Sequence, residues 1–240
     1  MTLYPTQLTL DIHLDTPLTF SHFVAGENAS LLAALQDRAQ TMQAGALYFW
    51  GAPHSGRTHL LHACLHLAQT LGRATHYIQA KTFYEPDLPQ TPGAILAVDD
   101  VEHLNPDAQI ALFNSFNRAR QFGQTLITTG NASPMMGLSV RDDLRTRIAQ
   151  SLIFEIHPLS EADCTHLLDE LAARKGLKIE PALVAYLLTH GTRDAASLSR
   201  TLDALDQASL THKRPLTLPL LREVMQGEPS LSSYQESLLP

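Results

Sequence analysis

The chain has 240 residues, and 44% of them are hydrophobic, which is enough to pack one sizeable domain and a smaller one. Its formal net charge of −7 and the absence of any run of Lys or Arg argue against a protein whose main task is to grip DNA phosphates. No apolar run approaches the roughly 18 residues of a membrane span. The N-terminus MTLYPTQLTLDIHL has no basic region followed by a hydrophobic core. These features predict a cytoplasmic protein that does not contact membranes.

The first 158 residues alternate between short apolar runs and helical patterns. Residues 1–18 are rich in Thr and Pro and predict an extended arm. Residues 30–43 show helical periodicity, with Leu31, Leu32, Leu35 and Met42 on or near one face. Strands are predicted at 46–50, 74–79, 94–99, 125–130 and 152–156, with helices at 58–71 and 107–122. Apolar strands separated by helices indicate a parallel sheet that is covered on both faces.

The pattern changes after Pro158, where only helical segments follow, at 160–175, 181–190, 194–209 and 218–225. Ser160 is a predicted N-cap, and Gly176 and Gly191 are predicted helix ends. We therefore expect an arm at 1–18, an α/β domain at 19–158 and an all-α domain at 159–226. The tail 227–240 is polar and rich in Pro and Ser, which is typical of disorder.

The segment GAPHSGRT (51–58) matches the phosphate-binding loop pattern G-x-x-x-x-G-K-[ST] at every defined position except the lysine, which is Arg57 here. It lies between a predicted strand and a predicted helix, so backbone N–H groups and the positive helix end can hold phosphates, and Thr58 can reach a magnesium ion. The alternative is an ordinary glycine-containing turn. The wide fork of Arg57 need not fit between the β- and γ-phosphates as an ammonium does. We expect diphosphate binding to tolerate this change better than hydrolysis does.

The apolar segment AILAVDD (94–100) ends in two carboxylates. Asp99 is placed to hold a magnesium ion directly or through water, and Asp100 stands where many ATPases keep a glutamate that activates water. An apolar strand that ends in two aspartates can also be a simple turn. Its spacing after the phosphate loop favours the catalytic interpretation.

Several segments in a fixed order resemble one family. They are TFSHFVAGENASLLAAL (19–35), GAPHSGRTHLLHA (51–63), AILAVDDVEHL (94–104), LITTGNASP (126–134), LRTRIAQSLIFEIHPLSEAD (144–163) and TRDAASLSRTLDALDQAS (192–209). This order resembles the ATPase module of the bacterial replication initiator DnaA, and within that group the regulatory inactivators of the initiator. The resemblance covers roughly residues 5–226. It implies an AAA+ core with a five-stranded parallel sheet, followed by a small helical lid.

The resemblance also implies roles for individual residues. Asn131 matches the sensor that orients water or the γ-phosphate, at a position where the family often has Asp. Arg147 matches the arginine finger offered to a neighbouring subunit's nucleotide, with Arg145 as the alternative. The expected nucleotide contacts are Phe23, Val24, Gly51, Ser55, Gly56, Arg57, Thr58, His59 and Arg193, where Phe23 and Val24 form the adenine wall and Arg193 is the second sensor. Core packing for Phe23 and Val24, and a solvated surface arginine for Arg147, are the simpler alternatives.

The arm carries the segment QLTLDI (7–12), which resembles the peptides with which this group docks on the sliding clamp of DNA polymerase III. Gln7 would place its amide in a polar notch, and Leu8, Leu10 and Ile12 would enter a groove. Asp11 stands where such peptides usually have proline. The tail segment 235–239 has a weaker likeness to the same peptides.

The function implied is that of a regulator that binds ADP (or ATP) with Mg, docks on the clamp and supplies Arg147 to DnaA, which then hydrolyses its ATP. The chain would reach DNA, and hence the nucleoid, only through the clamp, would not be an efficient ATPase alone, and could self-associate. A motor or helicase loader that uses its own site is the main alternative. A P-loop kinase for a small metabolite is a third, and it must explain the separate helical domain.

Overall fold

The computed structural model describes residues 18–84 and 87–227. Its N-terminal domain is built on a five-stranded parallel sheet with the strand order β2-β3-β4-β1-β5. The strands are β1 (Gly45–Trp50), β2 (Thr75–Gln79), β3 (Ile95–Asp99), β4 (Thr125–Gly130) and β5 (Leu152–Glu155). All five predicted strands are confirmed, and their carboxyl ends share one edge of the sheet.

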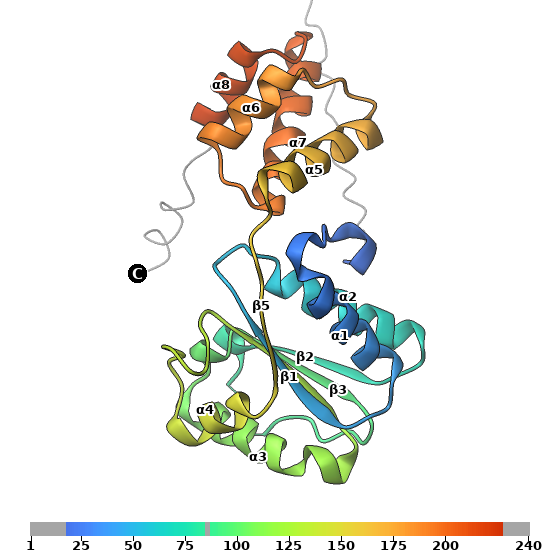
Figure 1. Ribbon diagram of the computed structural model, residues 1–240, viewed down its shortest axis with the longest axis vertical. Helices are drawn as coiled ribbons and strands as arrows, with labels where there is room; N and C mark the ends of the chain where they lie inside the picture. Colours follow the sequence, from blue (N-terminus) through green and yellow to red (C-terminus); the bar gives the residue numbers. More distant parts are fainter. Residues whose placement is uncertain (1–17, 85–86, 228–240) are drawn as a thin grey trace, which may run out of the picture.

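Helices cover both faces of the sheet (Figure 1). One face packs against α1 (Ala29–Gln40) and α2 (Arg57–Thr70), and the other against α3 (Pro106–Phe122) and α4 (Asp142–Ala149). Every residue of β3 and β4 is buried, as expected for central strands of a parallel sheet. Short 3-10 helices lie at Phe20–His22 (η1), Gly26–Asn28 (η2), Ala80–Thr82 (η3) and Val101–His103 (η4).

The C-terminal domain is a bundle of α5 (Glu161–Lys175), α6 (Pro181–His190), α7 (Ala195–His212) and α8 (Leu218–Gly227) with its own apolar core. The predicted cap of α5 is present, because the Ser160 hydroxyl accepts from the Asp163 N–H while the Asp163 carboxylate accepts from the Ser160 N–H. Asp194 caps α7 by accepting from the Ser197 N–H. The bundle lies beyond the carboxyl edge of the sheet and is joined to it after β5 (Figure 1). The expected lid is confirmed.

The predictions misplaced two helix ends and missed one helix; α7 ends at His212 instead of Ser209. The first helix ends at Gln40 instead of Gln43, and Met42 lies beyond it with 69% of its surface exposed. The reason is Arg73, whose guanidinium donates to the carbonyls of Arg38 and Thr41 at the end of α1. Helix α4 was missed, because its eight residues offer only Leu144 and Ile148 as an apolar pair at helical spacing.

Residues 1–17, with the candidate clamp-binding segment 7–12, and residues 228–240 lie outside the described part of the chain. Among the helices of residues 18–84 and 87–227, none has the length and apolar character required to cross a membrane.

Candidate nucleotide-binding site

A cavity of about 980 Å³ lies between the two domains. Its walls are the phosphate-loop residues 52–56, the segment 21–25, the linker 156–159 and the facing parts of α5 and α7. The size is at the upper end of the range for pockets that hold small ligands. Both domains are therefore needed to form the cavity.

The phosphate loop forms the floor of the cavity with backbone groups. Gly56 has φ of +97°, a conformation that glycine adopts without a Cβ penalty, and it leads directly into α2. No described side chain caps α2, so the N–H groups of its first turn remain free for an anion. The Ser55 hydroxyl is buried and has no partner among the described residues. A phosphate at this helix end would satisfy both features.

The two predicted adenine-wall residues lie at the junction of the domains. Phe23 packs on the core of the α/β domain, with its ring against Gly56 and 5.7 Å from the His59 ring, centre to centre. Val24 packs on the core of the lid. Both side chains also line the cavity. Each can therefore pack in a core and still contact a base, so the two interpretations are compatible.

His59 also lines the cavity, and its environment fixes its charge. Its Nε2 lies 3.0 Å from the Thr19 carbonyl, which can only accept, so Nε2 carries the proton. Burial lowers the pKa of His59 and outweighs the opposing effect of this hydrogen bond. His59 therefore faces the cavity as a neutral ring.

The lid contributes Arg193 to the cavity. Its Nε donates to the Leu188 carbonyl at 3.0 Å, and its Nη1 lies 3.8 Å from a Glu161 oxygen, so the guanidinium is only loosely paired. Burial raises the pKa of the neighbouring Asp194, but hydrogen bonds from Ser197 outweigh it, and the net shift is downward. Arg193 thus lines the same cavity as the phosphate-loop residues 52–56.

Sequence reasoning missed one face of α5 that also lines the cavity. His166, Glu170 and Arg174 follow one another at four-residue spacing and lie in the cavity wall. Glu170 is 3.5 Å from His166 and 3.9 Å from Arg174. Their helical spacing could have placed them on one face, but nothing in the sequence indicated that this face meets the phosphate loop.

A second missed feature fastens the linker between the domains. Asn28 is buried, donates to the His157 carbonyl at 3.0 Å and accepts from the His157 N–H at 2.8 Å. This amide thus pairs with the linker as a neighbouring strand would. It holds the linker against η2 at one wall of the cavity.

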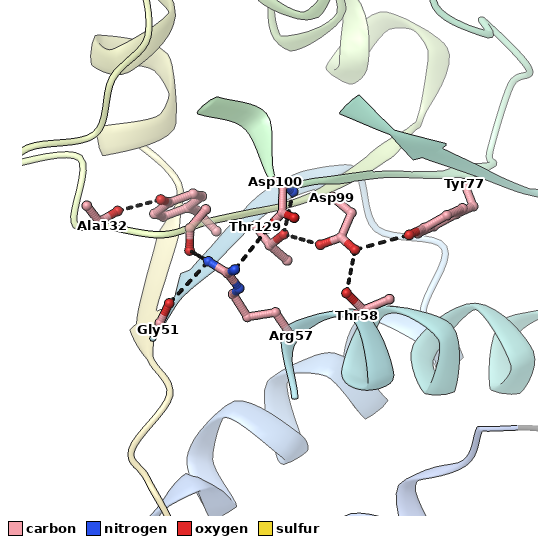
Figure 2. Close-up of polar contacts among 10 residues, drawn as sticks. Gly51, Arg57, Thr58, Tyr77, Asp99, Asp100, Thr129 and Ala132 are labelled. Atoms are coloured by element: carbon pink, nitrogen blue, oxygen red, sulfur yellow. Dashed lines mark hydrogen bonds and ion pairs between the residues drawn. The ribbon is translucent and has the colours of Figure 1, made fainter. Parts of the chain in front are cut away.

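Asp99 ends β3 and is only 3% exposed. Its carboxylate accepts from the hydroxyls of Thr58 at 2.7 Å and Tyr77 at 3.0 Å, and also from Thr129 (Figure 2). Because Thr58 gives its proton to Asp99, the lone pairs of its oxygen are free for a cation. Hard oxygen ligands of this kind suit magnesium. Thr58 and Asp99 are thus the residues that would hold a magnesium ion beside the phosphate loop.

Arg57 does not point into the cavity. Its Nη1 donates to the carbonyls of Gly51, at 3.1 Å, and Gly130, and its Nη2 lies 3.0 Å from Asp100 Oδ1 (Figure 2). The last contact lacks hydrogen-bond alignment and is an ion pair only. The Arg57 side chain is 11% exposed and that of Asp100 is 25% exposed. The two residues that the sequence offered for phosphate binding and water activation are thus paired with each other.

The candidate sensor Asn131 is exposed and follows β4 directly. The backbone on either side of it is held, because Arg57 donates to the Gly130 carbonyl and the Tyr48 hydroxyl donates to the Ala132 carbonyl. Burial raises the pKa of Tyr48, which stays protonated as a donor. Asn131 therefore sits on a fixed turn at the same sheet edge as Asp99 and Asp100.

The two candidate finger arginines lie on α4, away from the cavity. Arg145 pairs with Asp142 at 2.7 Å. The Arg147 guanidinium lies 5.6 Å from the centre of the Phe113 ring and 3.3 Å from the Gln150 amide oxygen. Among residues 18–84 and 87–227, no carboxylate lies within ion-pair distance of Arg147. Of the two, Arg147 has the guanidinium that is available to another molecule.

The predicted nucleotide contacts thus divide into two groups. Six of them line the cavity, namely Phe23, Val24, Ser55, Gly56, His59 and Arg193. The remaining three lie outside its wall, namely Gly51, Arg57 and Thr58. Gly51 and Thr58 flank the loop, whereas Arg57 is directed to the sheet edge.

The five-stranded parallel sheet, the phosphate-loop sequence at its carboxyl edge and the helical domain that follows make a fold of the AAA+ type. The structure is similar to domain III of the Thermotoga maritima replication initiator DnaA, at 18% identity with a TM-score of 0.74, over 87% of this chain and 95% of that domain. It is also similar to AMPPCP-bound DnaA from Aquifex aeolicus, at 19% identity with a TM-score of 0.67, over 81% and 66% of the two chains. The Thermotoga maritima Holliday junction motor RuvB matches at 17% identity with a TM-score of 0.69, over 88% and 72%.

Sequence similarity adds a narrower assignment. Residues 161–225, which contain nearly the whole helical bundle, match the family model of the Hda lid domain. The chain therefore has an AAA+ fold whose helical domain, over residues 161–225, matches the Hda lid. The lid match accounts for the separate helical domain, which the metabolite-kinase alternative had to explain.

Proposed function

We propose that this chain is an ADP-binding regulator that activates ATP hydrolysis by DnaA and so limits the initiation of replication. The Hda-type lid and the DnaA-like fold support a regulator that acts on DnaA. The AMPPCP bound to a protein of the same fold supports a nucleotide in the cavity between the domains. In this proposal the nucleotide orders the two domains, and the chemistry takes place on the partner.

The observation that carries the proposal is the placement of Arg147. Its guanidinium lies on α4 over Phe113, outside the chain's own cavity, and has no ion-pair partner among the described residues. A cation in such a place can be offered to the phosphates of a neighbouring AAA+ module. An arginine finger of this kind stabilises transition-state charge and is worth roughly three to five orders of magnitude in rate.

The chain's own phosphate site also supports a proposal in which hydrolysis takes place on the partner. Asp100, the candidate for activating water, is paired with Arg57, and Asp100 Oδ1 is buried from solvent. A general base must reach the proton that it removes. In the described arrangement the Asp100 side chain is 25% exposed, but its Oδ1 is buried against Arg57, so we expect slow hydrolysis by the isolated chain.

Replacing Arg147 tests the proposal. Arg147→Ala should remove most of the stimulation of DnaA, a loss of roughly three to five orders of magnitude in the stimulated rate. The measurement is single-turnover hydrolysis of labelled ATP on DnaA in the presence of DNA-loaded clamp. Arg145→Ala is the matched control, because Arg145 lies on the same helix but is paired with Asp142. Full stimulation by Arg147→Ala together with its loss in Arg145→Ala would assign the finger to Arg145 instead.

The clamp peptide is a second part of the proposal, and it rests on the resemblance of residues 7–12. Replacing Gln7 and Leu8 together by Ala should abolish capture by immobilised clamp and leave ADP binding unchanged. Thr9→Ala is the control, since Thr9 lies between the expected contact residues. Capture that survives the double replacement would move the docking site to the tail segment 235–239.

The alternative of an autonomous motor is supported by the similarity to RuvB and by the intact Thr58–Asp99 pair. It requires substantial turnover by the isolated protein. It also requires that Asp100→Asn removes this turnover, which would mean that the pair with Arg57 opens during the reaction.

A further inference from the structure

Arg57 uses both terminal nitrogens of its guanidinium inside the protein. The carbonyls of Gly51 and Gly130 share Nη1, and Asp100 holds Nη2 (Figure 2). The side chain is 11% exposed and does not line the cavity, although its neighbours Ser55 and Gly56 do. The position that normally supplies the loop's side-chain cation therefore directs its charge away from the phosphates.

The acceptors around Arg57 form a fixed arrangement at the carboxyl edge of the sheet. Gly51 follows β1 and Gly130 is the last residue of β4, and the Gly51 N–H also donates to the Gly130 carbonyl at 3.4 Å. By donating to both carbonyls, Arg57 adds one more hydrogen-bonded connection between the ends of these two strands. A lysine has one compact ammonium in place of a planar fork, and it cannot reach two carbonyls and a carboxylate in this way.

Asp100 is held from two sides. Its N–H donates to the Thr129 hydroxyl at 2.9 Å, and its φ of +54° is a left-handed conformation that is unusual for aspartate. Its carboxylate faces Arg57, and Oδ1 is buried. The charges of Arg57 and Asp100 neutralise each other beside the phosphate loop.

We infer that Arg57 determines which nucleotide the site prefers, favouring a diphosphate over a triphosphate. This inference rests on the nucleotide site of the proposed function. A diphosphate can be held by the loop N–H groups and the uncapped start of α2, as well as by Arg193 from the lid. A γ-phosphate adds negative charge for which the loop offers no side-chain cation, because Arg57 is engaged by Gly51, Gly130 and Asp100.

The test is the ratio of the dissociation constants of fluorescent ADP and of AMPPCP, measured by direct binding and competition with the chain alone. The wild type should bind ADP more tightly, by roughly ten- to hundredfold, the worth of one charged hydrogen bond. Arg57→Lys should shift the ratio toward AMPPCP by about tenfold or more, because the ammonium is no longer held by the three acceptors. Arg57→Met should change ADP affinity by less than about threefold, since no phosphate contact is lost.

Two further variants keep the test independent of folding defects. Asp100→Asn preserves the size of the side chain but removes the charge that holds Nη2, and it should shift the ratio in the same direction as Arg57→Lys. Arg120→Lys on the exposed side of α3 is the control and should leave the ratio unchanged.

The outcomes separate the inference from the proposed function. If both nucleotides bind the wild type and Arg57→Lys leaves their ratio unchanged, Arg57 does not determine the preference. If Arg57→Met loses both nucleotides alike, Arg57 is a phosphate ligand and the inference is wrong. If the wild type binds neither nucleotide, the nucleotide site of the proposed function fails.

Discussion

Arg57 and Arg147 lie in two regions of one domain, and their guanidinium groups have opposite surroundings. At the end of the phosphate loop, two carbonyls and a carboxylate surround Arg57 and leave it 11% exposed. On α4, Arg147 rests on the Phe113 ring with a single long contact to Gln150. The charge beside the phosphate loop is thus neutralised, whereas the charge on α4 has no ion-pair partner among the described residues, as the proposed function requires.

A third arginine, Arg73, has a buried guanidinium that can be compared with those of Arg57 and Arg147. Arg73 is 6% exposed and donates to the carbonyls of Arg38, Thr41 and Gly93 and to the Thr125 hydroxyl. These groups lie at the amino edge of the sheet, opposite to the phosphate loop. Arg73 is thus held as firmly as Arg57, but it lies at the opposite edge of the sheet from the candidate site.

The largest change in stability is expected for Arg73→Met. It leaves buried carbonyls without donors and should lower the free energy of unfolding by roughly 3 kcal/mol, which corresponds to a melting temperature lower by roughly 6–12 °C. Nucleotide binding and stimulation of DnaA, measured per folded molecule below the transition, should remain. Arg200→Met, on an exposed part of α7, is the control for loss of a surface arginine. A selective loss of stimulation would contradict a purely structural role for Arg73.

A smaller and more local change is expected for Gly56→Ala. At φ of +97° an added Cβ is strained and would lie 2.7 Å from the Phe23 ring. The strain costs about 1–2 kcal/mol, and displacement of the ring should weaken ADP binding by about tenfold or more. Calorimetric titration with ADP measures the effect.

The control for this change is Gly72→Ala. Gly72 has a φ of +78°, but nothing lies within 4 Å of its added Cβ. It should lose a similar amount of stability and keep its affinity for ADP. Equal losses of affinity in both variants would show that the contact between Gly56 and Phe23 does not shape the cavity.

The smallest effect concerns Glu102, which lies near the Arg57–Asp100 pair. One of its oxygens is buried without a partner among the described residues, and burial, followed by the charge of Asp100, raises the pKa of Glu102. A carboxyl whose pKa is higher in the folded state contributes stability at low pH that is lost as pH rises through the folded pKa. Glu102→Gln should therefore be more stable than wild type at pH 8, and the difference should vanish near pH 4. Thermal unfolding across this range measures it, and a difference independent of pH would contradict the assignment.

The sequence was sufficient for the features that follow from local pattern. The apolar runs gave all five strands, and the Ser160 cap with Asp163 marked the start of α5. Gly51, Gly56 and Thr58 marked the phosphate loop, because each of these positions has a backbone or hydroxyl requirement that few residues meet.

The direction of Arg57 could not be predicted in the same way. Its acceptor Gly130 is 73 residues away and becomes a neighbour only because β1 and β4 pair. Two other features could not be predicted because they depend on how the two domains meet. They are the face of α5 that lines the cavity and the hydrogen bonds between Asn28 and His157. Helix α4 was missed because its pattern covers only eight residues.

In the proposed function the chain promotes hydrolysis of a partner's ATP and does not hydrolyse its own nucleotide. The most direct measurement places the radiolabel on one protein at a time, either on ATP bound to DnaA or on ATP bound to this chain, and then mixes the two with DNA-loaded clamp. We predict rapid hydrolysis only of the label on DnaA, and its loss with Arg147→Ala. Rapid hydrolysis of the label carried by this chain, unaffected by Arg147→Ala, would contradict the account.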